Sequence, residues 1–516
     1  MNPMPNISVT TSQTGTSSSE NGKSYRGPFA IMTILFFMWG FITSINDILI
    51  PQFKDAFNLN YRQAMLVQFA FFGAYCIGSI AYFIISATKG DPIARLGYKN
   101  GVVIGLLIAA IGTALVWLGA TVHFYALILG GLFVIGLGFA MLQIAANPYV
   151  TILGPERTAS SRLNFAQAFN SVGTTTGPLI GGFLIFKYFA HAGVNQAESV
   201  KIPYVGFCIV FLIIAAIFFY IHLPHIGEGK VEHGIGSLKY PHVVLGMVAI
   251  FMYVGGEVSI GSSLINFLGE PTIAGLTHLE ASKYVALFWG GMLIGRFMGA
   301  VEMSEMKSSN KRLLLAGIPI LAFLLFWTIR SWNGDQHQLD FPAGWAIVKN
   351  YLPLLALCWL FFQFGKGLAD RTLFIFSAII VILLTIAVVF GGTLGMWCAV
   401  GVGLFTSIGW PNIFSLALDR MGVYKSQVSS LLVMAVIGGA LLPMLQGSIA
   451  DYINDAQKQA GASGVLSSFV QSLGDRSGLQ IGFIVPLIAY AYVAFYGIKG
   501  YKVGRTNNQL VPSGRG

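Results

Sequence analysis

Charged residues are scarce in this chain: Asp, Glu, Lys and Arg make up only 10% of its 516 residues, whereas hydrophobic residues make up 55%. A soluble protein carries about 25% charged residues, so the composition excludes a soluble globular protein. The sequence also lacks a nucleotide-binding loop, a metal-ligand cluster and the spacing of a catalytic triad, which argues against an enzyme. All four cysteines fall within apolar stretches, where they are expected to be small buried side chains rather than disulfides or metal ligands.

Long apolar runs are what the chain has in abundance. A membrane-spanning helix needs about 20 apolar residues, and about fourteen stretches approach that length, the one over 350–365 being short. They predict an all-α polytopic membrane protein. The expected spans are 29–53, 63–87, 101–120, 124–151, 163–189, 203–223, 242–268, 282–303, 311–329, 350–365, 372–391, 394–418, 427–450 and 479–500.

The net charge of +10 is explained by membrane topology rather than by nucleic-acid binding. With an even number of spans, twenty Lys and Arg residues fall on the side of the N-terminus, nine fall on the other side, and Arg296 lies within a span, which accounts for all thirty. Cytoplasmic loops are enriched in Lys and Arg. We therefore expect both termini in the cytoplasm.

The two halves of the chain repeat each other. Phe71, Gly73, Ile77 and Gly78 recur as Phe288, Gly290, Ile294 and Gly295; Pro148 and Arg157 recur as Pro411 and Arg420; and Gly173, Pro178 and Gly182 recur as Gly438, Pro443 and Gly447. The same order in both halves predicts a duplicated six-helix bundle.

The spacing between repeated residues grows from 217 in the first block to 263 in the second, which leaves room for 46 additional residues in the second half. We therefore expect an inserted helical hairpin. The predicted units are a disordered cytoplasmic tail over 1–28, an N-terminal bundle over 29–223, a cytoplasmic linker over 224–240, a C-terminal bundle over 241–502 with the hairpin near 305–370, and a cytoplasmic tail over 503–516.

The first span carries a carboxylate. Asp47 shares one helix face with Trp39, Thr43 and Asn46. A charge at the centre of a bilayer costs at least about 2.5–3.5 kcal/mol, so such residues usually have a functional role. We interpret Asp47, with Asn46 and Thr43, as a binding site for a coupling cation, and a purely structural capping role is the weaker alternative.

Amide side chains mark the fourth, fifth and tenth spans of the two bundles. Amides both donate and accept hydrogen bonds, which suits an uncharged polyhydroxylated ligand, and indoles stack on sugar rings. Paired proline interruptions at Pro148 and Pro411 point to the same region. Hydrogen bonding between helices is the structural alternative. The expected sugar-binding residues are Gln143, Asn147, Gln167, Asn170, Trp410, Asn412 and Trp39.

Two further charges lie within spans, Glu257 and Arg296. Counting from the span ends places them at similar depth. Because pairing neutralises charges inside a membrane, we expect a structural ion pair, with a coupling role for Glu257 as the alternative.

The runs NDILIPQF, AANPYVTILGPE, RLNFAQAFNS, YVGGEVSIGS and WPNIFSLAL resemble the fucose:proton symporter family of the major facilitator superfamily, and most closely its bacterial glucose/galactose transporter branch. The resemblance implies the major facilitator fold, a bacterial inner-membrane location and a coupling role for Asp47. Fucose permease has a glutamate in the corresponding run, whereas this chain has Gln143 in MLQIAANPYV, as the glucose/galactose branch, which includes sodium-dependent members, tends to have. Since glutamine binds no proton, Na⁺ bound at Asp47 is favoured over a proton as the coupling ion.

The polar residues within the spans, together with this resemblance, predict a symporter that imports glucose or galactose with a cation by alternating access. It requires no cofactor, and its expected partners are a hexose and membrane lipid, without nucleic acid or an obligate protein partner. A proton-coupled symporter of fucose or another sugar is the first alternative. A multidrug or metabolite exporter and a passive facilitator are the others.

Overall fold

The computed structural model describes residues 26–57, 61–182, 196–221, 236–333, 338–458, 474 and 476–504; for parts of several helices, including residues 45–56, 61–65 and 178–182, only the backbone is described. The described chain is almost entirely helical, as predicted. Thirteen helical segments within it are long and apolar enough to cross a membrane. The helix α6 is as long as several of them but more polar. It corresponds to the span expected over 163–189, of which residues 183–189 lie outside the described residues.

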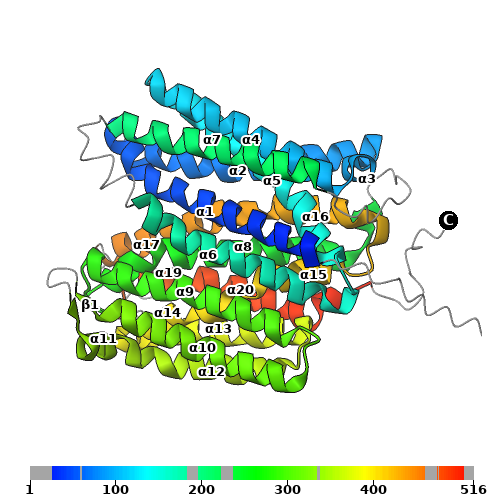
Figure 1. Ribbon diagram of the computed structural model, residues 1–516. Helices are drawn as coiled ribbons and strands as arrows, with labels where there is room; N and C mark the ends of the chain where they lie inside the picture. The colour runs from blue at the N-terminus through cyan, green and yellow to red at the C-terminus, as the bar shows by residue number, and fades with distance from the viewer. Residues whose placement is uncertain are drawn as a thin grey trace, which may run out of the picture.

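The N-terminal half forms the upper bundle in Figure 1. Its helices are α1 (Arg26–Ala56), α2 (Tyr61–Lys89), the short α3 (Pro92–Leu96), α4 (Tyr98–Thr121), α5 (Tyr125–Ile152), α6 (Ala159–Gly182) and α7 (Gln196–Tyr220), with the 3₁₀ turn η1 (Glu156–Thr158) between α5 and α6. The helix α1 packs along α6, and α4 packs between α5 and α7.

The C-terminal half repeats this arrangement below it. Its helices are α8 (Pro241–Gly269), α9 (His278–Glu302), α13 (Ala369–Phe390), α14 (Gly392–Thr406), α15 (Gly409–Leu418), α16 (Lys425–Met434), α17 (Gly438–Lys458), α19 (Gly478–Gly482) and α20 (Ile484–Ile498). Three of these spans are built in pieces, and the last of them consists of α19 and α20. The 3₁₀ turn η7 (Ala435–Ile437) joins α16 to α17, and α14 is followed by α15.

Additional helices lie at the outer edge of the second half (Figure 1). They are α10 (Ser308–Ser331), α11 (Phe341–Val348) and α12 (Leu352–Gly365), and they fall within the range 305–370 that the repeat spacing indicated. The two-residue strands β1 (Trp332–Asn333) and β2 (Gln338–Leu339) pair antiparallel between α10 and α11. Only 11% of the span in α10 is buried inside the protein, so this helix turns an apolar surface outward.

The helices α1 and α6, which both carry predicted site residues, pack closely against each other. A methyl group at Gly173 would collide with the backbone of Phe37 and Phe41, so only glycine lets the helices approach this far. The side-chain amide of Asn170 donates a hydrogen bond of 3.1 Å to the carbonyl of Phe36 in the same contact.

We expect Gly173→Ala to lower the free energy of unfolding by about 1–3 kcal/mol, the usual cost of overpacking a core. Thermal unfolding of the detergent-purified protein measures the effect. Gly130→Ala on α5 is the control, because its new Cβ would meet nothing within 4 Å. If the two variants proved equally stable, the close contact between α1 and α6 would be wrong.

Candidate functional site

Two amides on α5 are buried without complete hydrogen bonding. Gln143 is 6% exposed and Asn147 is 0% exposed. Among the described residues, Gln143 Oε1 and both Oδ1 and Nδ2 of Asn147 have no hydrogen-bond partner. A buried polar atom without a partner costs about 1–3 kcal/mol, so such atoms are rare in folded proteins. These atoms can bond the hydroxyls of a ligand that reaches them.

The predicted interruption of the helix beside these amides is wrong, because α5 continues through Pro148 to Ile152. Membrane helices tolerate proline when the freed backbone groups find other partners. Proline still lacks an N–H group, so the carbonyl of Ile144 loses its helical hydrogen bond next to Asn147. In the second half the expected interruption is present, since α14 ends at Thr406 and α15 begins at Gly409.

A tyrosine that the sequence analysis did not select connects two of the predicted residues. The Tyr75 hydroxyl on α2 is within hydrogen-bonding reach of the side chains of Gln143 and Trp39, and Tyr75 is 3% exposed. The Trp39 ring also packs edge-on against Phe139, with 6.3 Å between centroids. Tyr75 therefore holds α1, α2 and α5 together at the amides. Its position four residues after Phe71, within the first repeated block, was the signal available in the sequence.

The residues expected at the coupling site lie on α1. The hydroxyl of Thr43 donates to the carbonyl of Trp39 at 2.8 Å, which leaves the oxygen lone pairs available to a cation. Asn46 and Asp47 are within the helical range of α1, but their side chains lie outside the described residues. The cation site therefore stays a prediction.

Residues of α6 contribute through the backbone as well as through side chains. Gln167 is 6% exposed, and its main-chain carbonyl accepts a hydrogen bond of 3.3 Å from Arg296. The amide of Asn170 is directed to the carbonyl of Phe36. This contact agrees with the structural alternative for Asn170, whereas the Gln167 side chain remains a candidate ligand.

The two predicted residues of α15 differ in their surroundings. Trp410 is 8% exposed, stacks on Phe414 with 5.8 Å between ring centroids, and its Nε1 atom has no partner among the described residues. Asn412 is fully buried. Its Oδ1 atom accepts from Asn164 at 3.1 Å and its Nδ2 atom donates to the carbonyl of Ala369 at 3.2 Å. In this arrangement Asn412 joins the two halves instead of adding to the unpaired amides.

The charges of Glu257 and Arg296 do not meet directly. Within the described ranges, the ion pairs shorter than 4 Å involve other residues. Arg296 donates instead to the carbonyls of Ser407 at 3.2 Å and of Gln167, and to the Ser171 hydroxyl. Glu257 is within hydrogen-bonding reach of the Tyr253 side chain and is close enough to Arg296 for an electrostatic interaction. The arginine thus bridges the halves through α6 and the end of α14.

The halves are joined mainly at one end of the bundle, which we call the gate end: the end where α5, α9 and α15 finish and α6 and α16 begin. The Ser160 and Ser415 hydroxyls are 2.6 Å apart, and the Ser161 hydroxyl donates to the carbonyl of Ala300 at 2.6 Å. Two ion pairs lie farther out: Arg157 with Glu305, and Lys425 with Glu156 at 3.8 Å. Further hydrogen bonds between the halves join Asn164 to Asn412, Tyr98 to Ser426 and the carbonyl of Gln143 to Ser429.

A buried carboxylate supports the same end from the turn between α2 and α3. Asp91 is 3% exposed and accepts hydrogen bonds from the Tyr82 hydroxyl at 2.5 Å and the Ile93 amide at 2.9 Å. Burial raises the pKa of Asp91, and the hydrogen bonds oppose that rise. Tyr98, at the start of α4, is 3.4 Å from the Ser426 hydroxyl of the other half.

We expect the Asn164–Asn412 hydrogen bond to stabilise the joined halves measurably. Each single change to alanine should lower stability by about 1–3 kcal/mol, because a buried amide loses its partner. The double variant should cost less than the sum, with a coupling energy of about 0.5–3 kcal/mol typical of contacting residues. Thermal unfolding of the wild type, the two single variants and the double variant gives the free energies for this double-mutant cycle. Strict additivity would show that the two amides do not interact.

Comparison with known proteins agrees with this architecture. The family model of the Major Facilitator Superfamily matches residues 29–348. A glucose/galactose transporter of Brucella abortus is 40% identical over 485 residues, which cover 93% of this chain and 95% of the relative. The L-fucose-proton symporter of Escherichia coli is 29% identical, with 83% and 88% covered. The crystal structure of the transporter FucP in the outward conformation matches with a TM-score of 0.66 and 26% identity, over 92% of this chain and 99% of that chain. The chain is a multi-pass membrane transporter that belongs to the Major Facilitator Superfamily.

Proposed function

We propose that this protein imports glucose or galactose together with a cation, by alternating access between its two halves. The observation that carries the proposal is the pair of buried amides on α5: among the described residues, Oε1 of Gln143 and both polar atoms of the Asn147 amide lack partners. An uncharged polyol can satisfy both the donors and the acceptors of an amide. The relatives named as glucose/galactose transporters and as an L-fucose-proton symporter support a sugar as the substrate.

The proposed sugar site lies between the halves, near the middle of the bundle. Gln143 and Asn147 supply hydrogen bonds, and Tyr75 orients the Gln143 amide. Gln167 approaches from α6. The indoles of Trp39 and Trp410 offer apolar faces with a polar edge, which suits the ring of a sugar. Asn170 and Asn412 are placed at the border of this site, since their amides already bond the protein.

Sodium is the coupling ion that we favour. Asp47, with Asn46 and Thr43, provides a carboxylate and neutral oxygens, the kind of ligands that hard cations prefer. Gln143 occupies a position at which a glutamate would provide a second proton-binding group. A proton remains the alternative, and the relative named as a proton symporter supports it.

The orientation that we propose places the gate end in the cytoplasm, together with both termini, at the inner membrane of a bacterium. The loops at that end carry the excess of Lys and Arg. The joined gate end then corresponds to a state that opens outward. In the opposite state the contacts of Arg296 with α6 must break, and we place the ion pair of Arg296 with Glu257 in that state.

The test is counterflow and uptake of labelled glucose in proteoliposomes. We expect uptake to require a Na⁺ gradient and to change little between about pH 6 and 8, because a carboxylate with an ordinary pKa of about 3.9 stays ionised there. Gln143→Glu should add pH dependence. Full accumulation in sodium-free buffer on a proton gradient alone would rule out sodium and leave the proton mechanism. Failure of glucose and galactose to exchange at all would rule out the proposed substrate.

We expect Asp47→Asn to abolish accumulation of sugar against its gradient while counterflow persists. The amide keeps the size of the side chain but loses the charge that binds the cation. Thr158→Ser, in the 3₁₀ turn η1 before α6, is the control and should transport normally. Accumulation at the wild-type level by Asp47→Asn would remove Asp47 from the coupling site.

A further inference from the structure

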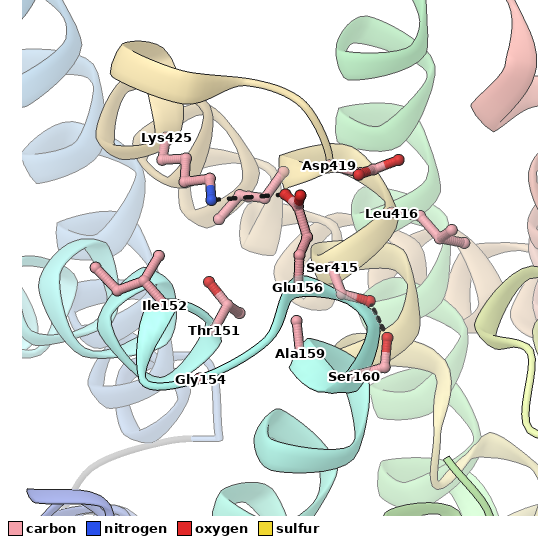
Figure 2. Close-up of a pocket in the computed structure, with 11 residues that line it drawn as sticks. Thr151, Ile152, Gly154, Glu156, Ala159, Ser160, Ser415, Leu416, Asp419 and Lys425 are labelled. Carbon is pink, nitrogen blue, oxygen red and sulfur yellow. Dashed lines mark hydrogen bonds and ion pairs between the residues drawn. The ribbon is translucent and has the colours of Figure 1, made fainter. Parts of the chain in front are cut away.

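A cavity of about 330 Å³ lies between the halves at the gate end. We call it the gate cavity. The end of α5, the start of α6, the end of α15 and the start of α16 surround it (Figure 2). Its volume falls within the range of roughly 300–1,000 Å³ that is usual for small-molecule sites. It is separate from the α5 amides, because neither Gln143 nor Asn147 lines it.

The polar lining of the gate cavity comes from both repeats. Glu156 and Asp419 are 263 residues apart, the same spacing that relates Pro148 to Pro411. The cavity thus has one carboxylate from each half, and Lys425 lies beside them (Figure 2). Two carboxylates against one ammonium group disfavour an anion and favour a ligand that donates hydrogen bonds.

The contacts inside the gate cavity leave space for hydroxyl groups. Lys425 Nζ is 3.8 Å from the Glu156 carboxylate, longer than the 2.7–2.9 Å of a direct charged hydrogen bond. A hydroxyl can donate to the carboxylate and accept from the ammonium group at the same time. The Ser160 and Ser415 hydroxyls, 2.6 Å apart, line the same cavity. The side chains of Ile152 and Leu418 add apolar surface, as the C–H face of a sugar requires.

We propose that the gate cavity is a second, regulatory site for a hexose, reached from the solvent at the gate end. This proposal rests on the proposed function, because it takes the transported hexose as its ligand. The cavity is lined by both halves and exists only while they are joined. A ligand that binds one state better shifts the population toward it. Hexose that has accumulated on the gate side therefore keeps the gate end shut and slows further import.

The test is acetylation of Lys425, followed by mass spectrometry of the purified protein at rising glucose or galactose concentrations. At a concentration of about ten times the Kd, simple occupancy lowers the acetylation rate roughly tenfold. Lys99, which lies over the ring of Phe219, is the internal control and should react at a constant rate. NaCl without sugar tests whether a cation alone fills the cavity.

Variants separate the two sugar sites. Ala159→Leu fills the gate cavity and should abolish the protection of Lys425 while labelled glucose still exchanges. Asn147→Ala should weaken exchange and leave the protection unchanged. Should Ala159→Leu fail to fold, Glu156→Gln replaces it, with Arg157→Gln as the matched control, because Arg157 makes the neighbouring ion pair outside the cavity lining.

Protection that disappears in Asn147→Ala but persists in Ala159→Leu would overturn the proposal, since Lys425 would then only report on the central site. Protection by NaCl alone, or no protection of Lys425 by hexose while exchange is intact, would overturn it too. If the wild-type protein exchanged neither glucose nor galactose, the proposed function itself would be contradicted.

Discussion

Polar groups inside a membrane-spanning bundle must find partners within the protein, because the hydrocarbon offers none. This constraint organises the interior of the molecule. Asn412 satisfies its amide by bonding Asn164 of the other half. Arg296 bonds the carbonyl of Gln167 and the Ser171 hydroxyl of the other half, and the Ser407 carbonyl of its own half. The polar atoms of the Asn147 amide have no hydrogen-bond partner among the described residues. The buried amides thus divide into those that hold the two halves together and those that remain available to a ligand.

The contacts at the gate end are numerous and individually weak, as a reversible gate requires. A net hydrogen bond contributes about 0.5–1.5 kcal/mol, and a solvent-exposed ion pair about 0–1 kcal/mol. The side chains of Arg157 and Glu305 are 78% and 42% exposed, so their ion pair belongs to the weak class. The buried Asn164–Asn412 and Arg296 contacts are therefore the ones that decide how firmly the end is closed. A ligand that binds one arrangement better by a few kcal/mol is enough to change its population.

The sequence predicts the fold well because apolar length and repeats are local properties of the chain. Even the inserted helices follow from the altered spacing between repeated residues, because α10, α11 and α12 lie within the predicted range 305–370. The site is predicted only in part. Spacing places Gln143 and Asn147 on one helix face, but it cannot tell that Asn412 bonds Asn164, 248 positions away. Nor can it give the partners of Arg296, which are mostly backbone carbonyls, since any residue type supplies those. Tyr75 was missed because only its place in the first repeated block distinguishes it from the many other aromatic residues of the chain.

The central claim is that Asn147 is a buried amide reserved for the sugar. The most direct measurement compares Asn147→Ala with the wild type in two ways: thermal unfolding without sugar, and calorimetric binding of glucose. We predict an unchanged or higher stability, because the amide has no protein partner to lose, together with an affinity lowered by about 1–3 kcal/mol, which corresponds to roughly 5- to 150-fold. A loss of stability with undiminished glucose affinity would contradict the account.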